Sequence, residues 1–136
     1  MQTALRALRS RDRTAAELEA RLRERGIADP ERRQALEQLE RIGYVDDARF
    51  AHGRAAVLAA RCSGDALIRD DLARRGVAPE LVEAALAGLE PELRRAEQVV
   101  ARRGSGPKTA RYLAARGFGA DAVATAVAPE GLDALE

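Results

Sequence analysis

The sequence predicts an all-α protein made of three tandem three-helix repeats. Apolar residues recur at helical spacing along the chain, and no segment shows the alternation of a half-buried strand. In addition, a motif of Leu, Arg three positions later, Gly and an apolar residue occurs three times, as LRERGI at 22–27, LARRGV at 72–77 and LAARGF at 113–118. Spacings of 50 and 41 residues are typical of a duplicated unit of about three short helices.

These motifs and the residues that end helices divide the chain into four segments. We expect repeat 1 at 1–45, repeat 2 at 46–89, repeat 3 at 90–128 and an acidic tail at 129–136. The tail contains three acids and no basic residue, and we expect it to be frayed.

Repeat 1 begins with a short apolar face formed by Ala4, Leu5 and Leu8. Thr14 and Glu17 have the spacing of a capping box, which opens a helix that ends at Gly26. Asp29 and Pro30 are then typical of the N-cap and first turn of a third helix. The residues expected to face the core of this repeat are Leu18, Leu22, Leu36, Leu39 and Ile42.

The stretch GYVDDARFA, at 43–51, joins repeat 1 to repeat 2. Gly43 is expected to end a helix with a positive φ, and Tyr44 and Val45 to fold back as apolar cover. Asp46 is expected to cap the next helix, while Asp47 favours the positive end of its dipole. Phe50 starts the buried face of that helix, next to Ala51.

The later helices show the same pattern of apolar spacing and of Gly and Pro residues at helix ends. In repeat 2 we expect a helix over 47–61, a second between Gly64 and Gly76, and a third from Pro79; the inward residues are Phe50, Val57, Leu58, Leu67, Ile68, Leu72, Val82, Ala85, Leu86 and Leu89. Repeat 3 opens at Pro91 and continues after Gly104; its apolar residues are Leu93, Ala96, Val100, Tyr112 and Leu113, then Val123, Ala126 and Val127 in a short last helix.

Composition argues against an enzyme or a membrane protein. No apolar run approaches the roughly 18 residues of a membrane span, and the first residues lack the apolar core of a signal peptide, so we expect a cytoplasmic protein. Single Cys62 and His52 residues leave no disulfide, zinc cluster or multi-histidine site. GSGPKT at 104–109 lacks the spacing of a phosphate-binding loop and indicates the start of a helix. We therefore expect no cofactor and no small-molecule substrate.

Both ends of the repeat array are basic, although the net charge of the chain is only +1: residues 1–28 carry seven Arg against four acids, and residues 90–128 carry seven basic groups against four acids. Arg25, Arg75 and Arg116 each precede a Gly at a helix end, where the helix dipole favours a cation. A denser group exceeds that need and is a candidate surface for a protein partner or for DNA phosphates, with a plain solvated face as the alternative: Arg94, Arg95, Arg102, Arg103, Lys108, Arg111 and Arg116. Because 22 of the 23 basic residues are Arg, a genome-wide bias also fits this pattern.

The stretch Gly43–Ala51 closely resembles the signature of the RecX family, small bacterial modulators of the RecA recombinase. Further matching stretches at 10–26, 64–77 and 112–118 extend the resemblance over about residues 3–128. One departure is Leu67, where the family usually has Lys or Arg. The resemblance implies an elongated, curved body that lies in the groove of the RecA filament on single-stranded DNA. It also implies suppression of ATP hydrolysis, strand exchange and co-protease activity by RecA, and we expect a monomer.

A helix-turn-helix DNA-binding module remains the alternative, because that motif also consists of about three short helices with a turn that often contains Gly. A groove-reading helix needs polar or basic residues at its start, and of the three second helices only the one that begins near 106–108 provides them. A helical scaffold for another protein partner is a third reading.

Overall fold

The computed structural model describes residues 13–128, and every regular element in that range is an α-helix. Unit 1 contains α2 (Ala15–Glu24) and α3 (Asp29–Arg41); unit 2 contains α4 (Asp47–Ala60), α5 (Asp65–Arg74) and α6 (Pro79–Ala87); unit 3 contains α7 (Glu92–Arg103), α8 (Pro107–Ala115) and α9 (Ala120–Val127). The predicted all-α fold is confirmed. The apolar face of Ala4, Leu5 and Leu8 and the tail at 129–136 lie outside the described residues.

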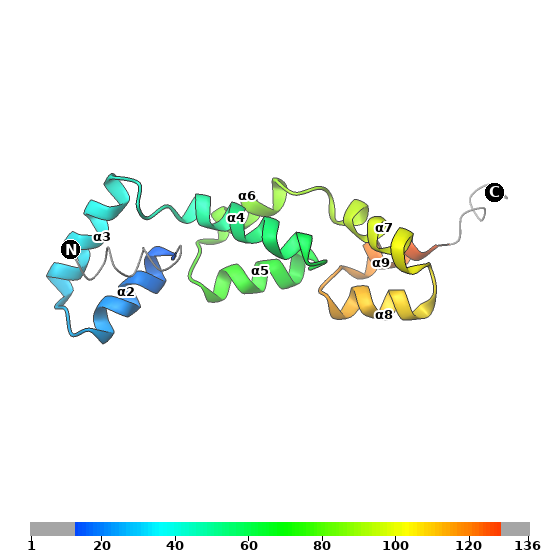
Figure 1. Ribbon diagram of the computed structural model, residues 1–136, viewed down its shortest axis with the longest axis horizontal. Coiled ribbons are helices and arrows are strands. Elements are labelled where there is room, and N and C mark those ends of the chain that lie inside the picture. The colour runs from blue at the N-terminus through cyan, green and yellow to red at the C-terminus, as the bar shows by residue number, and fades with distance from the viewer. Residues whose placement is uncertain (1–12, 129–136) are drawn as a thin grey trace.

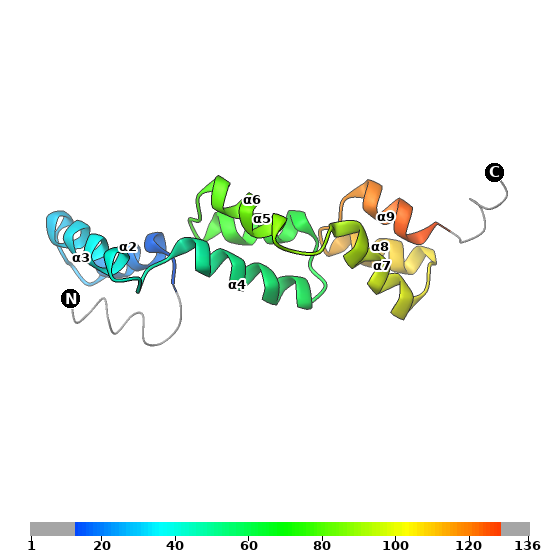
Figure 2. The same cartoon turned by 90° about the horizontal axis from the view of Figure 1, so that it is seen from above.

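The units lie in a row along the longest axis of the molecule, and two perpendicular views show the same elongated arrangement (Figures 1 and 2). Each unit buries its own apolar cluster. These clusters are centred on Leu18, Leu22 and Leu39 in unit 1, on Ala51, Ile68 and Leu72 in unit 2, and on Ala96, Val99 and Leu113 in unit 3. The helices within a unit pack closely, whereas neighbouring units meet only at narrow joints, so the array extends without one continuous core.

Several predicted inward residues face solvent. Ile42 is 58% exposed and Val57 is 43% exposed, and Leu67 and Leu93 are also open. In α7 the buried row runs through Arg95, Ala96 and Val99, which lies about one position away from the predicted row. The reason is that the buried sides of α4 and α7 carry small residues such as Ala51, Ala55 and Ala96, which let the neighbouring helices approach closely.

The helix ends agree with the sequence at most positions. Thr14 and Glu17 form the predicted capping box, and Gly43 has a φ of +81°. The Asp46 side chain accepts a hydrogen bond from the N–H of Arg49 at 3.0 Å, as predicted. Asp29 differs from the prediction, because the N-cap residue of α3 is Ala28 and Asp29 lies in the first turn.

Both joints use the same arrangement: the amino end of one unit's second helix rests on the Arg-Gly turn that follows the second helix of the next unit. At the joint of units 1 and 2, the hydroxyl of Thr14 donates to the carbonyl oxygen of Arg75 at 2.6 Å. At the joint of units 2 and 3, the N–H of Gly64 donates to the carbonyl oxygen of Arg116 at 2.7 Å. The motif that repeats in the sequence is therefore the part of each unit that binds its neighbour.

Candidate partner-binding surface

An acidic residue at the start of the first helix of units 2 and 3, Asp47 or Glu92, completes each joint. The N–H of Ala15 donates to Oδ1 of Asp47 at 2.9 Å, and the N–H of Asp65 donates to Oε2 of Glu92 at 2.7 Å. The second oxygen of Glu92 accepts the N–H of Gly119 at 3.0 Å. Each carboxylate thus satisfies a backbone donor at the start of a helix that belongs to the preceding unit.

Arg95 belongs to the joint of units 2 and 3. Its side chain is only 9% exposed, and its guanidinium donates to the carbonyl oxygens of Glu90 at 3.0 Å and Ser63 at 2.9 Å, and to the carboxylate of Asp65. The guanidinium also lies over the ring of Phe118, with its central carbon 5.9 Å from the ring centroid. The prediction that Arg95 lies on the open surface is therefore wrong. Its N–H groups are occupied by hydrogen bonds to the carbonyl oxygens of Ser63 and Glu90 and to the carboxylate of Asp65.

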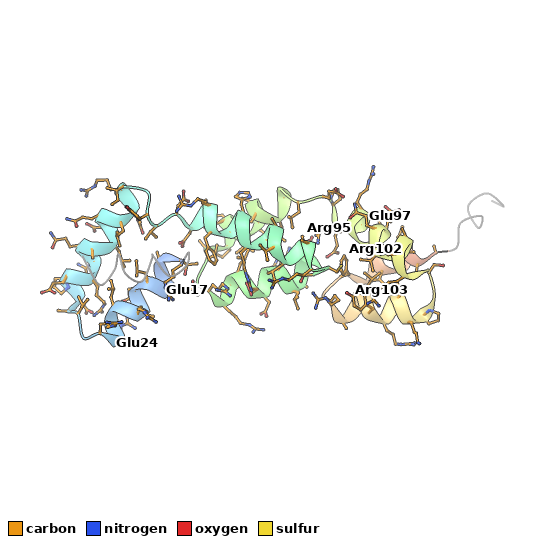
Figure 3. All side chains as sticks on the ribbon, in the orientation of Figure 1. Glu17, Glu24, Arg95, Glu97, Arg102 and Arg103 are labelled. Atoms are coloured by element: carbon orange, nitrogen blue, oxygen red, sulfur yellow. The ribbon has the colours of Figure 1, made fainter. Side chains whose placement is uncertain are left out.

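Arg116 and Arg102 also point toward unit 2. Arg116 donates to the carbonyl oxygens of Arg61 at 2.6 Å and Cys62 at 3.3 Å, where α4 ends. Nη2 of Arg102 lies 3.5 Å from Sγ of Cys62. Cations at the carboxyl end of α4 satisfy unpaired carbonyls and match the negative end of the helix dipole. Figure 3 shows Arg95 and Arg102 on α7, on the side near unit 2.

The remaining candidate cations point outward. Arg94, Arg103, Lys108 and Arg111 are all exposed. Lys108 and Arg111 are three residues apart on α8, which places them on the same side of that helix. The guanidinium carbon of Arg103 stacks over the ring of Tyr112 at 3.6 Å from its centroid, so α7 and α8 are connected at their shared end.

We call Arg103, Lys108 and Arg111 the distal corner, since they lie where α7 ends and α8 begins. Within 98–128 the sequence has five basic residues and one acid, Asp121, which is in the first turn of α9. The first turn of α8 contains no acidic residue and holds Lys108 instead. Positive charge at this corner is therefore not neutralised by a neighbouring carboxylate among the described residues of unit 3.

A charged network joins units 1 and 2. Asp71 accepts two hydrogen bonds from Arg54, at 3.0 and 3.1 Å, and a third from Arg75 at 3.2 Å; Arg75 in turn contacts Glu17 of unit 1 at 3.2 Å. The hydrogen bonds from Arg54, with the charges of Arg54 and Arg75, hold the pKa of Asp71 below its ordinary value. Every charge in this network has an opposite partner, so it stabilises the joint and offers no open anion site.

The GYVDDARFA stretch proves to be mainly structural. Ala51 is fully buried, Phe50 is partly buried beneath Arg75, and Asp47 binds unit 1 as described above. Tyr44 departs from the prediction, because it is 55% exposed and only Val45 covers the apolar cluster of unit 1. Tyr44 and nearby Ile42 leave an apolar surface beside this stretch.

Sequence reasoning missed the role of the joints. The signal was present, because the Arg-Gly pairs at 75–76 and 116–117 and the acids Asp47 and Glu92 recur at matching places in the repeats. What the sequence does not show is that each pair contacts the unit before it. The structure divides the seven candidate cations accordingly: Arg95 and Arg116 donate to carbonyls at the joint, Arg102 is exposed with its guanidinium near Cys62, and the other four are exposed.

Other predicted features lie where the sequence placed them. GSGPKT starts α8, with Gly106 as the N-cap residue, and His52 is exposed on α4. Within residues 13–128, no group of three or more His, Cys, Asp or Glu side chains could hold a metal ion. No helix in that range is long and apolar enough to cross a membrane.

Small helical units, of two described helices in unit 1 and three in units 2 and 3, are joined end to end by polar contacts and define a helical-repeat protein. The family model described as the first three-helix domain of RecX matches residues 1–39, and the one described as the second matches residues 46–86. The chain therefore belongs to the RecX family of regulatory proteins.

Curated relatives agree with this assignment. The "Regulatory protein RecX" of Trichlorobacter lovleyi is 35% identical over 88% of this chain and 88% of its own length, and that of Chromohalobacter salexigens is 36% identical over 92% and 88%. That of Mycolicibacterium vanbaalenii is 41% identical, but this chain spans only 54% of its length. The crystal structure of RecX from Lactobacillus salivarius shares the fold, with a TM-score of 0.80 at 21% identity over 93% of this chain and 90% of that chain.

Proposed function

We propose that this protein binds the RecA recombinase, or its filament on single-stranded DNA, and inhibits the ATPase, strand-exchange and co-protease activities of RecA. It would thereby modulate DNA repair, homologous recombination and the SOS response. Membership of the RecX family is the observation that carries the proposal. We further propose that it acts as a monomer in the cytoplasm, without a cofactor or small-molecule substrate, and that it is not an enzyme.

The architecture supports this proposal. A row of similar units presents similar surfaces at regular intervals along one axis (Figure 1). A filament of identical protomers also repeats at regular intervals, so one elongated molecule can contact more than one protomer. Because both joints are narrow and polar, the spacing of the units depends on a few hydrogen bonds. We propose that this spacing is part of the recognition.

The open cations supply the second element of the proposal. Arg94, Arg103, Lys108 and Arg111 are available for carboxylates of a protein partner or for phosphates of single-stranded DNA. Arg102 is also exposed and stays a candidate for direct contact. Arg116 donates to carbonyl oxygens of unit 2, so we propose that it contributes by positioning unit 3.

The direct test is the rate of ATP hydrolysis by the RecA protein of the same organism on single-stranded DNA, measured with increasing amounts of this chain. We expect inhibition at concentrations well below that of RecA, because one molecule that blocks filament growth or bridges protomers affects many. A protein that only coated DNA through phosphate contacts would need near-saturating amounts and would lose most of its affinity between about 50 and 200 mM salt. Unchanged ATP hydrolysis at all ratios would contradict the proposal.

The helix-turn-helix alternative has less support from the structure. The amino ends of α2 and α5 are covered by the joints, where Thr14 and Gly64 are buried. Of the second helices of the three units, α8 alone has an exposed amino end, and it starts with Pro107 and Lys108. A major-groove reader would bind duplex DNA with sequence preference in the absence of RecA, which an equilibrium titration with duplexes of differing sequence measures.

A further inference from the structure

A cleft of about 430 Å³ lies at the joint of units 2 and 3, and we call it the joint cleft. One wall is the last turn of α4, which contributes Ala59 and Ala60, and the opposite wall is α7, which contributes Val99 and Arg102. The small side chains of the two alanines leave this space open, since a larger residue there would project into it. The walls belong to different units, so a ligand in the joint cleft contacts both.

The floor of the joint cleft is apolar. Val99 and Phe118 line it and are only 3% and 5% exposed, and both belong to the buried cluster of unit 3. The volume is in the lower part of the range of sites that enclose small ligands, roughly 300–1,000 Å³. The joint cleft therefore has room for a few side chains of a partner, and its floor favours an apolar one.

Arg102 gives the joint cleft its positive charge. Its guanidinium makes one contact with the other described residues, at 3.5 Å to Sγ of Cys62, and sulfur is a weak acceptor. Arg95 also lines the cleft, but its donors are occupied within the joint. No Asp or Glu among residues 13–128 lines this cleft. Arg102 is thus an exposed cation beside an apolar floor, with N–H donors available to an anion (Figure 3).

This combination fits a segment of a protein better than a nucleic acid. A carboxylate accepts paired hydrogen bonds from a guanidinium, and apolar neighbours of that carboxylate can cover the floor. A nucleic-acid strand instead needs several cations along its phosphates, together with accessible aromatic rings on which bases stack. The joint cleft offers one available cation, and Phe118 is buried. Arg103 does not add a second cation, because it stacks on Tyr112 of α8.

We propose that the joint cleft is a docking site for a segment of a protein partner in which an Asp or Glu is flanked by apolar residues. The carboxylate pairs with Arg102, and an apolar side chain packs on Val99 and Phe118. Because each unit supplies one wall, the bound segment also holds units 2 and 3 at a fixed spacing. Where that segment belongs to RecA, this inference rests on the proposed function, whereas the chemistry of the cleft does not.

Cys62 reports whether the joint cleft is occupied. It is the only cysteine of the chain, it is partly exposed, and it lines the cleft. The rate at which N-ethylmaleimide alkylates this thiol, followed by mass spectrometry of the fragment that contains it, therefore measures access to the cleft.

The first measurement uses two capped peptides at millimolar concentration, acetyl-Leu-Asp-Leu-amide and acetyl-Leu-Asn-Leu-amide, without RecA. We expect the peptide with Asp to slow the alkylation of Cys62 by about twofold or more, and the peptide with Asn to leave the rate unchanged. In the variant Arg102→Gln, the difference between the two peptides should disappear. Equal rates with both peptides on the wild-type chain would overturn the proposal.

The second measurement uses a filament of RecA from the same organism on single-stranded DNA. We expect alkylation of Cys62 to slow by about tenfold once most of the chain is bound, and to be unaffected by the DNA strand alone. Protection by the strand alone would overturn the proposal in favour of a phosphate ligand. Inhibition of RecA without protection of Cys62 would overturn the assignment of the RecA contact and leave the proposed function intact. Absence of inhibition would contradict the proposed function, and the peptides would still decide the chemistry of the cleft.

A pair of charge variants tests the role of Arg102 in the inhibition of RecA. Arg102→Gln should raise the concentration needed for half-inhibition by about fivefold, because one ion pair with the partner is lost. Arg41→Gln is the matched control, since it also removes an exposed Arg from the last turn of a helix, and it should leave that concentration unchanged. Equal inhibition by the two variants would count against a partner contact at Arg102.

A pair of size variants tests the space itself without a change in charge. Ala60→Phe projects into the joint cleft and should weaken inhibition by a similar factor. Ala56→Phe lies at an exposed position of the same helix outside the cleft lining and should not. Circular dichroism checks that both variants keep the helical content of the wild type. Full inhibition by a folded Ala60→Phe variant would overturn the proposal.

Discussion

Nη1 of Arg95, in unit 3, donates a hydrogen bond of 2.9 Å to the carbonyl oxygen of Ser63 in unit 2, and both residues are buried. The neighbouring residue Arg94 is exposed. Two adjacent arginines thus have different roles, one in joining the units and one in facing solvent.

This pair gives the first prediction. Arg95→Ala should lower the free energy of unfolding by about 2–3 kcal/mol, because the buried carbonyl of Ser63, the carbonyl of Glu90 and the Asp65 carboxylate lose their donor. Arg94→Ala should change it by less than about 0.5 kcal/mol, as expected for an exposed position. Urea unfolding followed by circular dichroism measures both. Similar stability of the two variants would contradict the assignment of Arg95 to the joint.

The second prediction concerns the close approach of backbones at the joint of units 2 and 3. A Cβ on Gly64 would lie 2.4 Å from the carbonyl carbon of Gly117, so Gly64→Ala should cost about 1–3 kcal/mol by forcing the two units apart. Gly53 lies in the interior of α4 with open space around it, so Gly53→Ala should raise stability by about 0.5–1 kcal/mol. Thermal unfolding of both variants should therefore shift in opposite directions, and two shifts of the same sign would count against this packing.

The third prediction is a pH dependence at the joint of units 1 and 2. The pKa of Asp71 is lowered in the folded protein, chiefly by hydrogen bonds from Arg54. Its ion pairs therefore contribute stability above the unfolded-state pKa of about 3.9, and this stability is lost as the pH falls through the lower folded-state pKa. We expect Asp71→Asn to be about 1 kcal/mol less stable than the wild type at neutral pH. This difference should shrink toward zero in acid.

The control for this prediction is Glu83→Gln. Glu83 also has a lowered pKa, because Arg69 hydrogen-bonds to it, but that pair is open to solvent. Its variant should show a smaller difference from the wild type at every pH. A gap for Asp71→Asn that is independent of pH would mean that the carboxylate charge does not stabilise the joint.

The fourth prediction tests the open cations in the proposed function. The double substitution Lys108→Glu with Arg111→Glu should weaken inhibition of RecA ATP hydrolysis by about tenfold, if each site contributes roughly 0.7 kcal/mol to binding. The helical content should not change, since both side chains are exposed. The matched control, Arg33→Glu with Arg41→Glu, makes the same change in charge at exposed positions of α3. Equal loss of inhibition in both variants would show that charge alone, and not this surface, is responsible.

Local signals in the sequence predicted the helices well. The capping pair Thr14 and Glu17, the helix stop at Gly43 and the cap at Asp46 depend on residues within a few positions of one another. Such interactions are determined by the local chain, so spacing alone is sufficient to identify them. The repeated Leu-x-x-Arg-Gly motif likewise located the second helix of every repeat.

Contacts between units could not be predicted in the same way. Arginine is usually a surface residue, so the sequence pattern places Arg95 outside. Its burial depends on hydrogen bonds to the carbonyls of Ser63 and Glu90, which the helical spacing of apolar residues does not predict. Val57 and Leu67 are apolar, so the sequence pattern places them in the core of unit 2. Other residues, among them the small Ala51 and Ala55, fill that core, and Val57 and Leu67 remain exposed. The surface therefore contains apolar side chains that the pattern placed inside, and a joint contains a cation that the pattern placed outside.

The start of α8 differs from the starts of α2 and α5 in one residue type that matters for the joints. Counted from the N-cap residue, Pro107 occupies the position of Ala15 and Asp65, whose N–H groups donate to the acid of the following unit. Proline has no N–H to donate. Lys108 likewise replaces Ala16 and Ala66, and Ala16 is the residue on which the Gly76 turn rests. At the joint of units 2 and 3, however, the Gly117 turn packs against Leu67. The feature that both joints share and that the start of α8 lacks is therefore the N–H donor. The start of α8 consequently cannot repeat the hydrogen bond that Ala15 and Asp65 each donate to a carboxylate of the following unit.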